Sequence, residues 1–341
     1  MPDSRSCFSG CERNRVKVLV TGGAGYIGSV VTAELIKRQH QVFVYDNLSH
    51  GFRAAVPRKI DLIVGDIADK ANLTRVITTI GIEAVMHFAA LIEAGESMKV
   101  PERYFRNNSS NTLSLLEVLL ETGVTKFVFS STAALYGEPE STPIRETDTL
   151  RPTNAYGESK LLVERMLDWF HRVHSLHYAS LRYFNAAGAT EELGEAHQPE
   201  THLIPIILQV ALGKRDSISI YGTDYPTPDG TCVRDYVHVV DLAQAHLLAL
   251  EALEQKPQQI YNLGNGRGFS VREVIETTRR VSGHKLRAVE APRRAGDPAV
   301  LVASSEKIQS ELGWKPQHAE LEQIISSAWQ WHQKHPNGYS S

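Results

Sequence analysis

The most constraining feature of the sequence is a short β-branched run that leads directly into three regularly spaced glycines. Residues 16–20 (VKVLV) are apolar on both faces of a strand, and Gly22, Gly25 and Gly28 follow with the spacing G-x-x-G-x-x-G. An amphipathic pattern then continues to Arg38. This order is typical of a buried parallel strand, a tight turn and a helix N-terminus. Such a turn lets backbone N–H groups approach a pyrophosphate closely, so it predicts a dinucleotide site.

An acidic residue after the next predicted strand indicates which dinucleotide is bound. Residues 41–45 form a second apolar run, which ends in Asp46 and Asn47, 18 residues beyond Gly28. A carboxylate at this point accepts hydrogen bonds from the ribose hydroxyls of the adenosine half. Because the same carboxylate repels a 2′-phosphate, we expect NAD rather than NADP as the cofactor.

The remainder of the first half alternates strands with helices. The predicted strands are residues 60–64, 84–88, 126–129 and 178–183, and the predicted helices are residues 71–79, residues 101–122 and the segment that carries Tyr156 and Lys160. Such alternation produces right-handed βαβ units and a parallel sheet, with ligands bound beyond the carboxyl ends of the strands. The predicted fold class is therefore α/β, a Rossmann-type doubly wound parallel sheet with a smaller α/β C-terminal substrate domain.

The chain length suggests two domains. At 341 residues the chain exceeds the size of about 250–300 residues at which single cores stop growing. We expect a disordered N-terminal extension at residues 1–15, an NAD-binding domain at residues 16–185 with returning segments near 235–263, and a substrate-binding domain at residues 186–341. In the later part, residues 237–253 are predicted to be a helix and residues 259–263 a strand of the main sheet. Ser270 and Glu273 have the spacing of a capping box at the start of another helix.

Tyr156 and Lys160 are spaced to act together in proton transfer. Side chains four residues apart on a helix share one face, with Cβ atoms about 5–6 Å apart. Lowering a tyrosine pKa from 10 to about 7 requires roughly 4 kcal/mol. A cation some 6 Å away contributes about 2.8 kcal/mol at an effective dielectric of 20, so Lys160 and an oxidised nicotinamide together would suffice. In isolation the pair would be explained better as an exposed helical pair, but the upstream glycine loop and the Thr132 hydroxyl at a strand end favour catalysis.

Composition and charge argue against several other classes of protein. With a net charge of −3, the chain has no excess of basic residues that would bind nucleic acid or an anionic membrane surface. No apolar run approaches the roughly 18 residues that span a bilayer, and residues 1–15 lack the apolar core of a signal peptide. Cys7, Cys11 and Cys232 make neither a disulfide framework nor a four-ligand zinc site. We therefore expect a cytoplasmic protein without a metal site.

Several motifs together resemble a known family. A resemblance to the extended short-chain dehydrogenase/reductase family rests on the glycine loop, Asp46-Asn47, GDI at 65–67, HFAA at 87–90, FSST at 129–132, YG at 136–137 and the pair Tyr156 and Lys160. Within it, the chain closely resembles the UDP-glucose 4-epimerases in GES at 95–97, LRYFN at 181–185, YGTDYPT at 221–227, DGTCVRDYVH at 229–238, IYNLG at 260–264 and PRRAGD at 292–297. The resemblance extends from residue 16 to the C-terminus.

This resemblance implies reversible epimerisation at C4 of UDP-glucose and UDP-galactose through a transient 4-keto sugar. Tyr156 would remove the 4-hydroxyl proton while hydride passes to a tightly held NAD, and the sugar would turn over before the hydride returns. Lys160 would lower the tyrosine pKa and hold the nicotinamide ribose. Thr132 would hydrogen-bond the reacting oxygen; these epimerases often carry serine at this position, and threonine keeps the hydroxyl.

The expected binding residues form two sets. The expected cofactor contacts are Gly22, Gly25, Tyr26, Ile27, Gly28, Asp46, Asn47, Asp66, Ile67, Phe88, Ala89, Ala90, Asn107, Ser130, Tyr156, Lys160 and Phe184. The expected substrate contacts are Thr132, Tyr156, Asn185, His202, Leu203, Tyr221, Arg234, Arg294, Asp297 and Leu301. Arg234 and Arg294 are implied to clamp the diphosphate, which suits the charge and fork of a guanidinium. Tyr221 is implied to pack on the uracil. His202 stands where some relatives have asparagine, and a lone histidine is more often structural than catalytic.

Other activities on the same scaffold are alternatives. Dehydratases that eliminate water need an acid–base pair directly after the catalytic threonine, commonly Asp-Glu, whereas this chain has Ala133 and Ala134. Two methyl groups cannot move protons, which argues against a dehydratase, and a decarboxylase of the same fold is the neighbouring alternative. A non-catalytic NAD-binding regulator would need the glycine loop but not Tyr156 and Lys160.

Substrate breadth and assembly are two further expectations. In the family, a position in residues 298–302 gates the space for an N-acetyl group, and Leu301 is assigned to it. A leucine, smaller than the tyrosine of some relatives, would leave space for UDP-N-acetylglucosamine. The helices around residues 101–122 and 155–174 carry apolar residues on more than one face. Since the family pairs these helices in a four-helix bundle, we expect a homodimer.

Overall fold

The computed structural model describes residues 15–294 and 297–339, and its centre is a seven-stranded parallel sheet. In spatial order the strands are β10 (Gln258–Leu263), β6 (His177–Tyr183), β5 (Lys126–Thr132), β4 (Ala84–His87), β1 (Lys17–Thr21), β2 (Gln41–Asp46) and β3 (Asp61–Val64). All neighbouring pairs are parallel. The strand order reverses between β1 and β4, where doubly wound sheets bind ligands. The predicted fold class and the predicted return of residues 259–263 to this sheet are confirmed.

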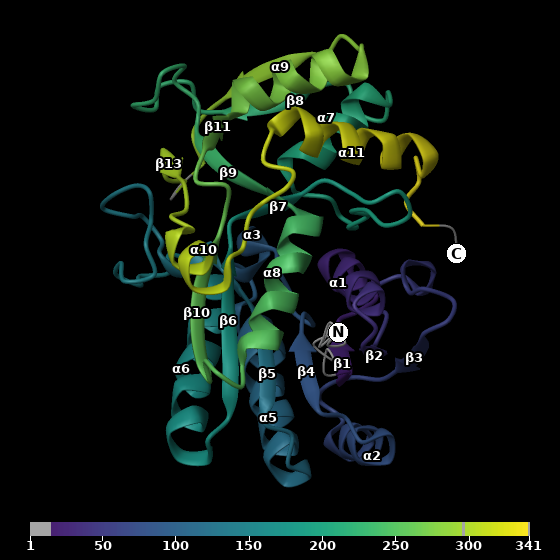
Figure 1. The fold of residues 1–341 in the computed structure, drawn as a ribbon. Helices are drawn as coiled ribbons and strands as arrows, with labels where there is room; N and C mark the ends of the chain where they lie inside the picture. The colour runs from purple at the N-terminus through teal and green to yellow at the C-terminus, as the bar shows by residue number, and fades with distance from the viewer. Residues whose placement is uncertain (1–14, 295–296, 340–341) are drawn as a thin grey trace, which may run out of the picture.

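Helices cover both faces of the sheet (Figure 1). One face carries α1 (Tyr26–Lys37) and α8 (Val239–Ala252), and the other carries α2 (Lys70–Ile80), α5 (Asn111–Thr122) and α6 (Ala155–His174). Successive side chains of a strand point to opposite faces. Val18 and Val20 therefore enter the core under α1 and α8, whereas Leu19 enters the core under the other three helices. This two-sided burial explains why the first strand is apolar throughout.

The helix predicted over residues 101–122 is interrupted. After the short helix α3 (Ala94–Ser97), the chain forms α4 (Pro101–Tyr104), a π-helical turn η2 (Phe105–Ser110) and then α5. A π-helical turn adds a residue to the helix and often marks a functional position. Here it aims Asn108 inward, where the side-chain amide donates to the Leu91 carbonyl at 2.9 Å and accepts from the Leu91 N–H at 2.9 Å.

A smaller layer lies at the carboxyl end of the sheet, at the top of Figure 1. Its strands are β7 (Asn185–Ala187), β9 (Val233–His238), β11 (Gly268–Ser270) and β13 (Val300–Leu301) in one sheet, and β8 (Ile218–Tyr221) with β12 (Ala288–Ala291) in another. Its helices are α7 (Leu203–Ala211), α9 (Val271–Ser282) and α11 (Leu321–Lys334), whereas α10 (Glu306–Leu312) packs against β10 and α8 of the main sheet. The predicted capping box at the start of α9 is confirmed, because Ser270 and Glu273 each accept a hydrogen bond from the backbone of the other.

The start of the helix predicted over residues 237–253 was wrong. Residues 233–238 form strand β9, and α8 begins at Val239. β9 is paired with β7, β11 and β13, so hydrogen bonds to distant segments hold it extended. The short strand β7, where no strand was predicted, is formed by the same long-range pairing.

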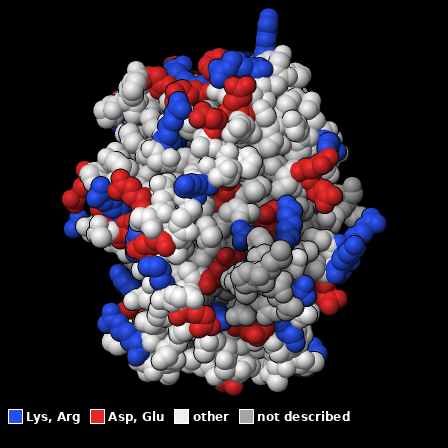
Figure 2. Space-filling model, viewed as in Figure 1, with Lys and Arg blue, Asp and Glu red and all other residues white. Residues whose placement is uncertain are grey.

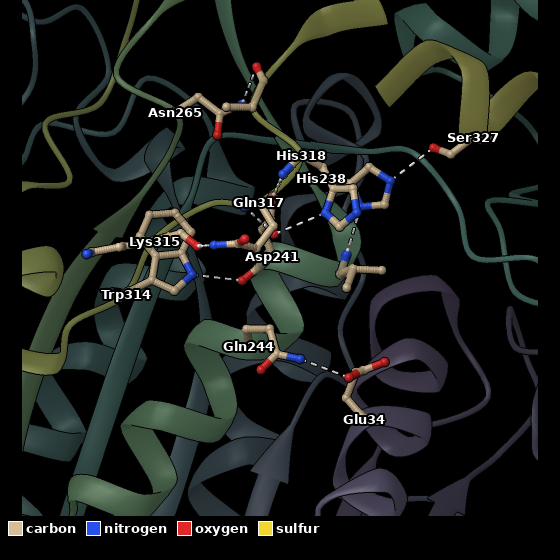
Figure 3. Close-up of polar contacts among 12 residues, drawn as sticks. Glu34, His238, Asp241, Gln244, Asn265, Trp314, Lys315, Gln317, His318 and Ser327 are labelled. Atoms are coloured by element: carbon tan, nitrogen blue, oxygen red, sulfur yellow. Dashed lines mark hydrogen bonds and ion pairs between the residues drawn. The ribbon is translucent and has the colours of Figure 1, made fainter. Parts of the chain in front are cut away.

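A buried carboxylate ties the C-terminal segment to α8 (Figure 3). Asp241 is 1% exposed and accepts hydrogen bonds from the backbone N–H groups of Gln317 and His318 at 2.9 and 2.8 Å. The Trp314 indole donates to the Asp241 carbonyl at 2.9 Å, and the rings of His318 and His238 stack with centroids 4.4 Å apart. The segment that precedes α11 is therefore held against the helix that covers the main sheet.

The surface carries both signs of charge. On the face drawn in Figure 2, Lys and Arg are interspersed with Asp and Glu. Across residues 15–294 and 297–339, no helix combines the length and the apolar composition required to cross a bilayer. The predicted N-terminal extension, apart from Arg15, and the cysteines Cys7 and Cys11 lie outside the described residues.

Candidate active site

A pocket opens at the carboxyl ends of β1 to β5. It is lined by most of the predicted cofactor contacts, namely Gly22, Gly25, Tyr26, Ile27, Gly28, Asp46, Asn47, Asp66, Ile67, Phe88, Ala89, Ala90, Asn107 and Ser130. The other predicted cofactor contacts lie off this wall: Tyr156 and Lys160 on α6, and Phe184 against a small apolar cluster with Tyr136 and Ile144. We call this space the cofactor pocket.

The backbone at the start of α1 forms a tight cradle, in which a side chain on Gly22 or Gly28 would clash with neighbouring backbone atoms. Gly22 has φ +73°, and a Cβ at this residue would lie 2.4 Å from the Ala89 nitrogen. A Cβ on Gly28 would lie 2.3 Å from the Gly22 carbonyl oxygen. No side chain caps the helix at Gly25. The first N–H groups of α1 thus lack an intrahelical acceptor and face the pocket, an arrangement that fits the diphosphate of the expected dinucleotide.

Asp46 is held in position by the loops around it. One carboxylate oxygen accepts a hydrogen bond from the Ala24 N–H at 3.0 Å and the other from the Leu48 N–H at 2.8 Å. Asn47 donates to the Asp66 carboxylate at 2.8 Å and so joins the ends of β2 and β3. Burial raises the pKa of Asp46, and these two N–H groups oppose that change. The carboxylate is thereby oriented at the pocket edge, where a ribose could donate hydrogen bonds to it.

Helix α6 brings Tyr156 and Lys160 to the end of β5. Its first turn is capped by Asn154, whose side chain accepts from the Gly157 N–H at 2.8 Å. The Lys160 ammonium donates to the Ser130 carbonyl at 2.8 Å and lies 4.8 Å from the centre of the Phe129 ring. Since Ser130 lines the cofactor pocket, Lys160 lies directly behind the wall of that pocket.

Burial shifts both members of this pair toward their neutral forms. It lowers the pKa of Lys160 to about 7. It also raises the pKa of Tyr156, while a hydrogen bond with Thr132 lowers it in part. Desolvation disfavours whichever form is charged, which accounts for the opposite directions. In the protein alone, therefore, Tyr156 is a phenol, and a base would form only with added positive charge.

A buried ion pair fixes α6 one turn beyond Lys160. The Arg182 guanidinium on β6 donates to both carboxylate oxygens of Glu164, at 2.6 and 3.0 Å, and both side chains are at most 5% exposed. Ser131 donates to the same carboxylate at 2.6 Å. Paired and hydrogen-bonded in this way, the charges are tolerated in the interior and lock α6 to the strands that carry the site. Glu164 and Ser131 were not among the predicted site residues.

A second pocket lies in the smaller layer, and it contains most of the predicted substrate contacts. Its lining includes Asn185, His202, Leu203, Tyr221, Arg234, Arg294 and Asp297. Arg234 pairs with Asp297, and the Arg294 guanidinium lies 4.0 Å from the centre of the Tyr221 ring. The Asn185 amide donates to the Asp235 carbonyl at 2.9 Å. We call this space the arginine pocket.

Thr132, Tyr156 and Leu301 lie outside the lining of the arginine pocket. Thr132 is opposite Tyr183 in the β5–β6 register, two residues before Asn185. The Thr132 hydroxyl accepts a hydrogen bond from the Ala134 N–H at 3.1 Å and so begins the 3₁₀ turn η3 (Ala133–Leu135). Leu301 packs against the apolar cluster that contains Ala133. These residues thus lie around the end of β5. Thr132 comes two residues after Ser130 of the cofactor pocket, and its partner Tyr183 comes two residues before Asn185 of the arginine pocket.

Comparison with known proteins identifies the family. The NAD dependent epimerase/dehydratase family matches residues 18–264. The chain belongs to this family. A UDP-glucose 4-epimerase from Halalkalibacterium halodurans is 53% identical over 327 residues, which is 95% of this chain and 98% of that protein. A crystal structure of a UDP-glucose 4-epimerase has a TM-score of 0.93 at 51% identity and covers 95% of this chain and 100% of its own. The structure of the Bifidobacterium longum UDP-glucose 4-epimerase in complex with NAD+ and UDP has a TM-score of 0.90 at 38% identity, covering 95% and 100%.

Membership of this epimerase family confirms the resemblance, the enzymatic nature of the chain and NAD as its cofactor. Several residues of the cofactor pocket were nevertheless not predicted: Tyr45, Ser49, His50, Gly51, Gly65, Leu91, Ile92, Glu93, His197 and Gln198. Most follow a predicted strand within a few residues, so the strand ends could have indicated them. His197 and Gln198 come from the smaller layer, and no local pattern in the sequence connects them with this pocket.

Proposed function

We propose that this chain interconverts UDP-glucose and UDP-galactose by reversible oxidation at C4, with Tyr156 as the base. One observation supports the proposal: Lys160 donates to Ser130 in the wall of the cofactor pocket, and the neighbouring strand β6 leads within two residues to Asn185 in the arginine pocket. A sugar attached to a diphosphate in the arginine pocket could extend toward Tyr156. An acid–base group between a cofactor and a substrate is what reversible oxidation requires.

The residues around the reacting carbon would have separate tasks. NAD, when bound, supplies the hydride acceptor and a positive charge. Tyr156 would take the proton of the 4-hydroxyl group and return it to the same oxygen after the sugar has turned over. Its raised pKa makes the protein alone a poor base, so the ammonium form of Lys160 and the bound cofactor would have to lower that pKa together. Thr132, whose hydroxyl lowers the pKa of Tyr156 in part, would hold the reacting oxygen.

Arg234 and Arg294 would bind the substrate diphosphate. Both line the arginine pocket, and a guanidinium presents paired donors that suit phosphate oxygens. Arg234 is paired with Asp297, so a diphosphate would compete with that carboxylate for the guanidinium. Tyr221, already stacked under Arg294, would pack on the uracil.

Two alternatives are less well supported. A dehydratase would need an acid–base pair after Thr132, and η3 instead begins with Ala133 and Ala134. A non-catalytic NAD-binding regulator would have no use for a buried lysine that donates to the wall of the cofactor pocket.

UDP-N-acetylglucosamine is a further candidate substrate, because Leu301 would leave space for the acetyl group. Epimerisation of this sugar at a rate similar to UDP-glucose would support that candidate, and absence of turnover would exclude it.

We also propose two features of organisation. One is the division into an NAD-binding domain, residues 16–185 with returning segments near 235–263, and a substrate-binding domain, residues 186–341; in its support, all seven strands of the parallel sheet fall in the first domain. A homodimer would cover the exposed apolar residues on α5 and α6, such as Leu113, Trp169 and Val173, which are 36%, 63% and 64% exposed. In light scattering, Trp169→Glu should shift the mass from dimer to monomer. Val289→Glu, at an exposed apolar position on β12, should not.

The decisive experiment is to incubate the purified protein with UDP-galactose, without added NAD, and to measure UDP-glucose. We expect conversion, because a cofactor regenerated in every cycle can stay bound. If no UDP-glucose forms even after NAD is added, the proposed reaction is wrong. If Tyr156→Phe retains full activity, the reaction stands and the assigned base is wrong.

A further inference from the structure

Two histidines and two glutamates in the loop before α7 form a compact cluster outside the proposed catalytic residues. Glu195, His197, Glu200 and His202 are spaced E-x-H-x-x-E-x-H, and each offers one nitrogen or oxygen atom such that all four atoms lie within 4.8 Å of one another. We propose that this cluster binds one divalent transition-metal ion, with Zn²⁺ as the best-suited ion. The proposal does not rest on the proposed epimerase reaction, although His197 and His202 also line the two pockets, and the sequence alone led us to expect no metal.

The distances in the cluster suit such an ion. The His202 Nδ1 atom lies 2.8 Å from Glu195 Oε1 and 3.0 Å from Glu200 Oε1, and the His197 Nδ1 atom lies 3.0 Å from Glu195 Oε1. Zinc bonds of about 2.0–2.2 Å to nitrogen and oxygen place tetrahedral ligands roughly 3.4 Å apart. Outward shifts of about half an ångström would therefore open the centre of the cluster to the ion. Two imidazoles with two carboxylates form a donor set that zinc commonly uses.

Burial of the two carboxylates gives a reason for a cation. The Glu195 and Glu200 side chains are only 6% and 4% exposed. Buried carboxylates need a compensating positive charge, and a dication neutralises both while the imidazoles stay uncharged. Glu200 is held in place by the backbone N–H groups of Thr201 and His202, each 2.8 Å from its Oε1 atom. Such outer hydrogen bonds orient metal ligands.

The cluster is also accessible. The side chains of His197 and His202 are 21% and 42% exposed, and a pocket beside the cluster is lined by Glu195, His197, Glu200 and His332. An ion could enter from this side without unfolding the loop. The same pocket contains Lys214, whose positive charge is the main feature opposing a cation nearby.

The position of the cluster indicates a structural role for the metal. His197 lines the cofactor pocket, and its ring packs edge-on against Tyr26 of α1, with centroids 6.3 Å apart. His202 is the residue directly before α7 and lines the arginine pocket. Tyr26 also donates a hydrogen bond to the Gly188 carbonyl at 2.6 Å. An ion held by four protein ligands has no open position for chemistry, so it would brace this loop between the two pockets.

Metal analysis tests the proposal. The full chain without a histidine tag should be stripped with EDTA, dialysed against Zn²⁺ and analysed by mass spectrometry of the metal. We expect one zinc per chain and a rise in the thermal midpoint that EDTA reverses. His197→Ala and Glu195→Gln should weaken zinc binding by more than about tenfold. His284→Ala, which removes an exposed histidine far from the cluster in sequence, should bind as the unaltered protein does.

Two controls keep the result interpretable. Zinc binding should persist in Cys7→Ser/Cys11→Ser, which removes the thiols outside the described residues. Retention of NAD by Glu195→Gln, whose altered side chain does not line the cofactor pocket, would show that loss of zinc does not reflect unfolding. Failure to bind zinc, or equal binding by the unaltered protein and His197→Ala, would overturn the proposal. The cluster would then be a pair of histidines held only by hydrogen bonds to the carboxylates. Neither result depends on epimerase activity.

Discussion

The cofactor pocket and the arginine pocket are suited to bind a diphosphate by different physical means. Among the described residues that line the cofactor pocket there is no Lys or Arg, and Asp46, Asp66 and Glu93 are acidic. Backbone N–H groups at the start of α1 are its donors. The arginine pocket instead contains Arg215, Arg234 and Arg294. One pocket depends on main-chain geometry, which only glycine permits, and the other on long side chains that can be repositioned.

This difference has a consequence for how tightly each ligand is held. The backbone cradle is rigid and preorganised, so it loses little entropy when the cofactor binds. The guanidinium groups are already engaged, Arg234 with Asp297 and Arg294 with Tyr221, and must exchange partners for a diphosphate. We therefore expect NAD to stay bound while UDP-sugars exchange.

The largest expected effect is the loss of kcat on substitution of Tyr156. Tyr156→Phe removes the proton-transfer group and should lower kcat by about 10²–10⁴-fold, the usual contribution of general acid–base catalysis. Because neither pocket loses a wall residue, the NAD content and the KM for UDP-galactose should change little. Tyr178→Phe is the matched control, since its hydroxyl contacts Gln258 far from the site. A large loss of NAD from Tyr156→Phe would contradict the separation of binding from catalysis.

The backbone cradle should fail at Gly22. In Gly22→Ala the new Cβ would meet the Ala89 nitrogen at 2.4 Å, at a φ of +73° that disfavours alanine. The loop must shift to relieve this contact, so the N–H groups at the start of α1 should lose their alignment with the diphosphate. Loss of one hydrogen bond to a charged group, about 1.5–3 kcal/mol, would lower NAD affinity about 10- to 150-fold. The cofactor released on denaturing the purified variant measures this loss. Gly283→Ala has the same strain at φ +72° but meets nothing within 4 Å, and it should keep its NAD.

A smaller effect is expected at Arg294. Arg294→Ala should raise the KM for UDP-galactose about tenfold, as expected for loss of one charge-assisted hydrogen bond at an exposed position. The NAD content should be unaffected. Arg293→Ala is the control, because the adjacent Arg293 pairs with Asp224 rather than lining the pocket. Equal increases in KM for both variants would mean that only the general charge of this segment matters.

The smallest effect concerns the stability of the sheet below the cofactor pocket. Burial lowers the pKa of His87 to about 3 and that of His246 to about 4. Both histidines are neutral in the folded protein but protonate near pH 6.5 when unfolded. Their contribution to stability is therefore complete above about pH 6.5 and declines as the pH falls toward 4 or 3. At pH 6 the loss is about 1 kcal/mol for each histidine.

Urea unfolding midpoints at pH 7.5 and 6 measure this change. When the pH is lowered from 7.5 to 6, the midpoint of the unaltered protein should fall relative to that of His246→Gln. If the variant and the unaltered protein respond equally to pH, His246 does not contribute to the acid sensitivity.

Prediction from sequence succeeded for features that depend on residues close together in the chain. The glycine spacing, Asp46 after the second strand and the capping box of α9 each depend on residues within one or two elements. The failures lie where distant segments meet. β7 and β9 are strands because they pair with each other and with β11 and β13, and no periodicity in residues 185–187 or 233–238 shows this. The inward turn at Asn108 depends on the Leu91 backbone, which lies 17 residues away.

The sequence by itself determined the strands of the main parallel sheet, the glycine turn, the choice of NAD and the pairing of Tyr156 with Lys160. Each follows from short-range sterics, hydrogen bonding or charge. Only the tertiary structure decided that burial makes Tyr156 a weaker acid and Lys160 a weaker base, because desolvation depends on everything packed around them. It alone also brought His197 to the cofactor pocket and grouped it with Glu195, Glu200 and His202, since that grouping requires the loop before α7 to fold against α1.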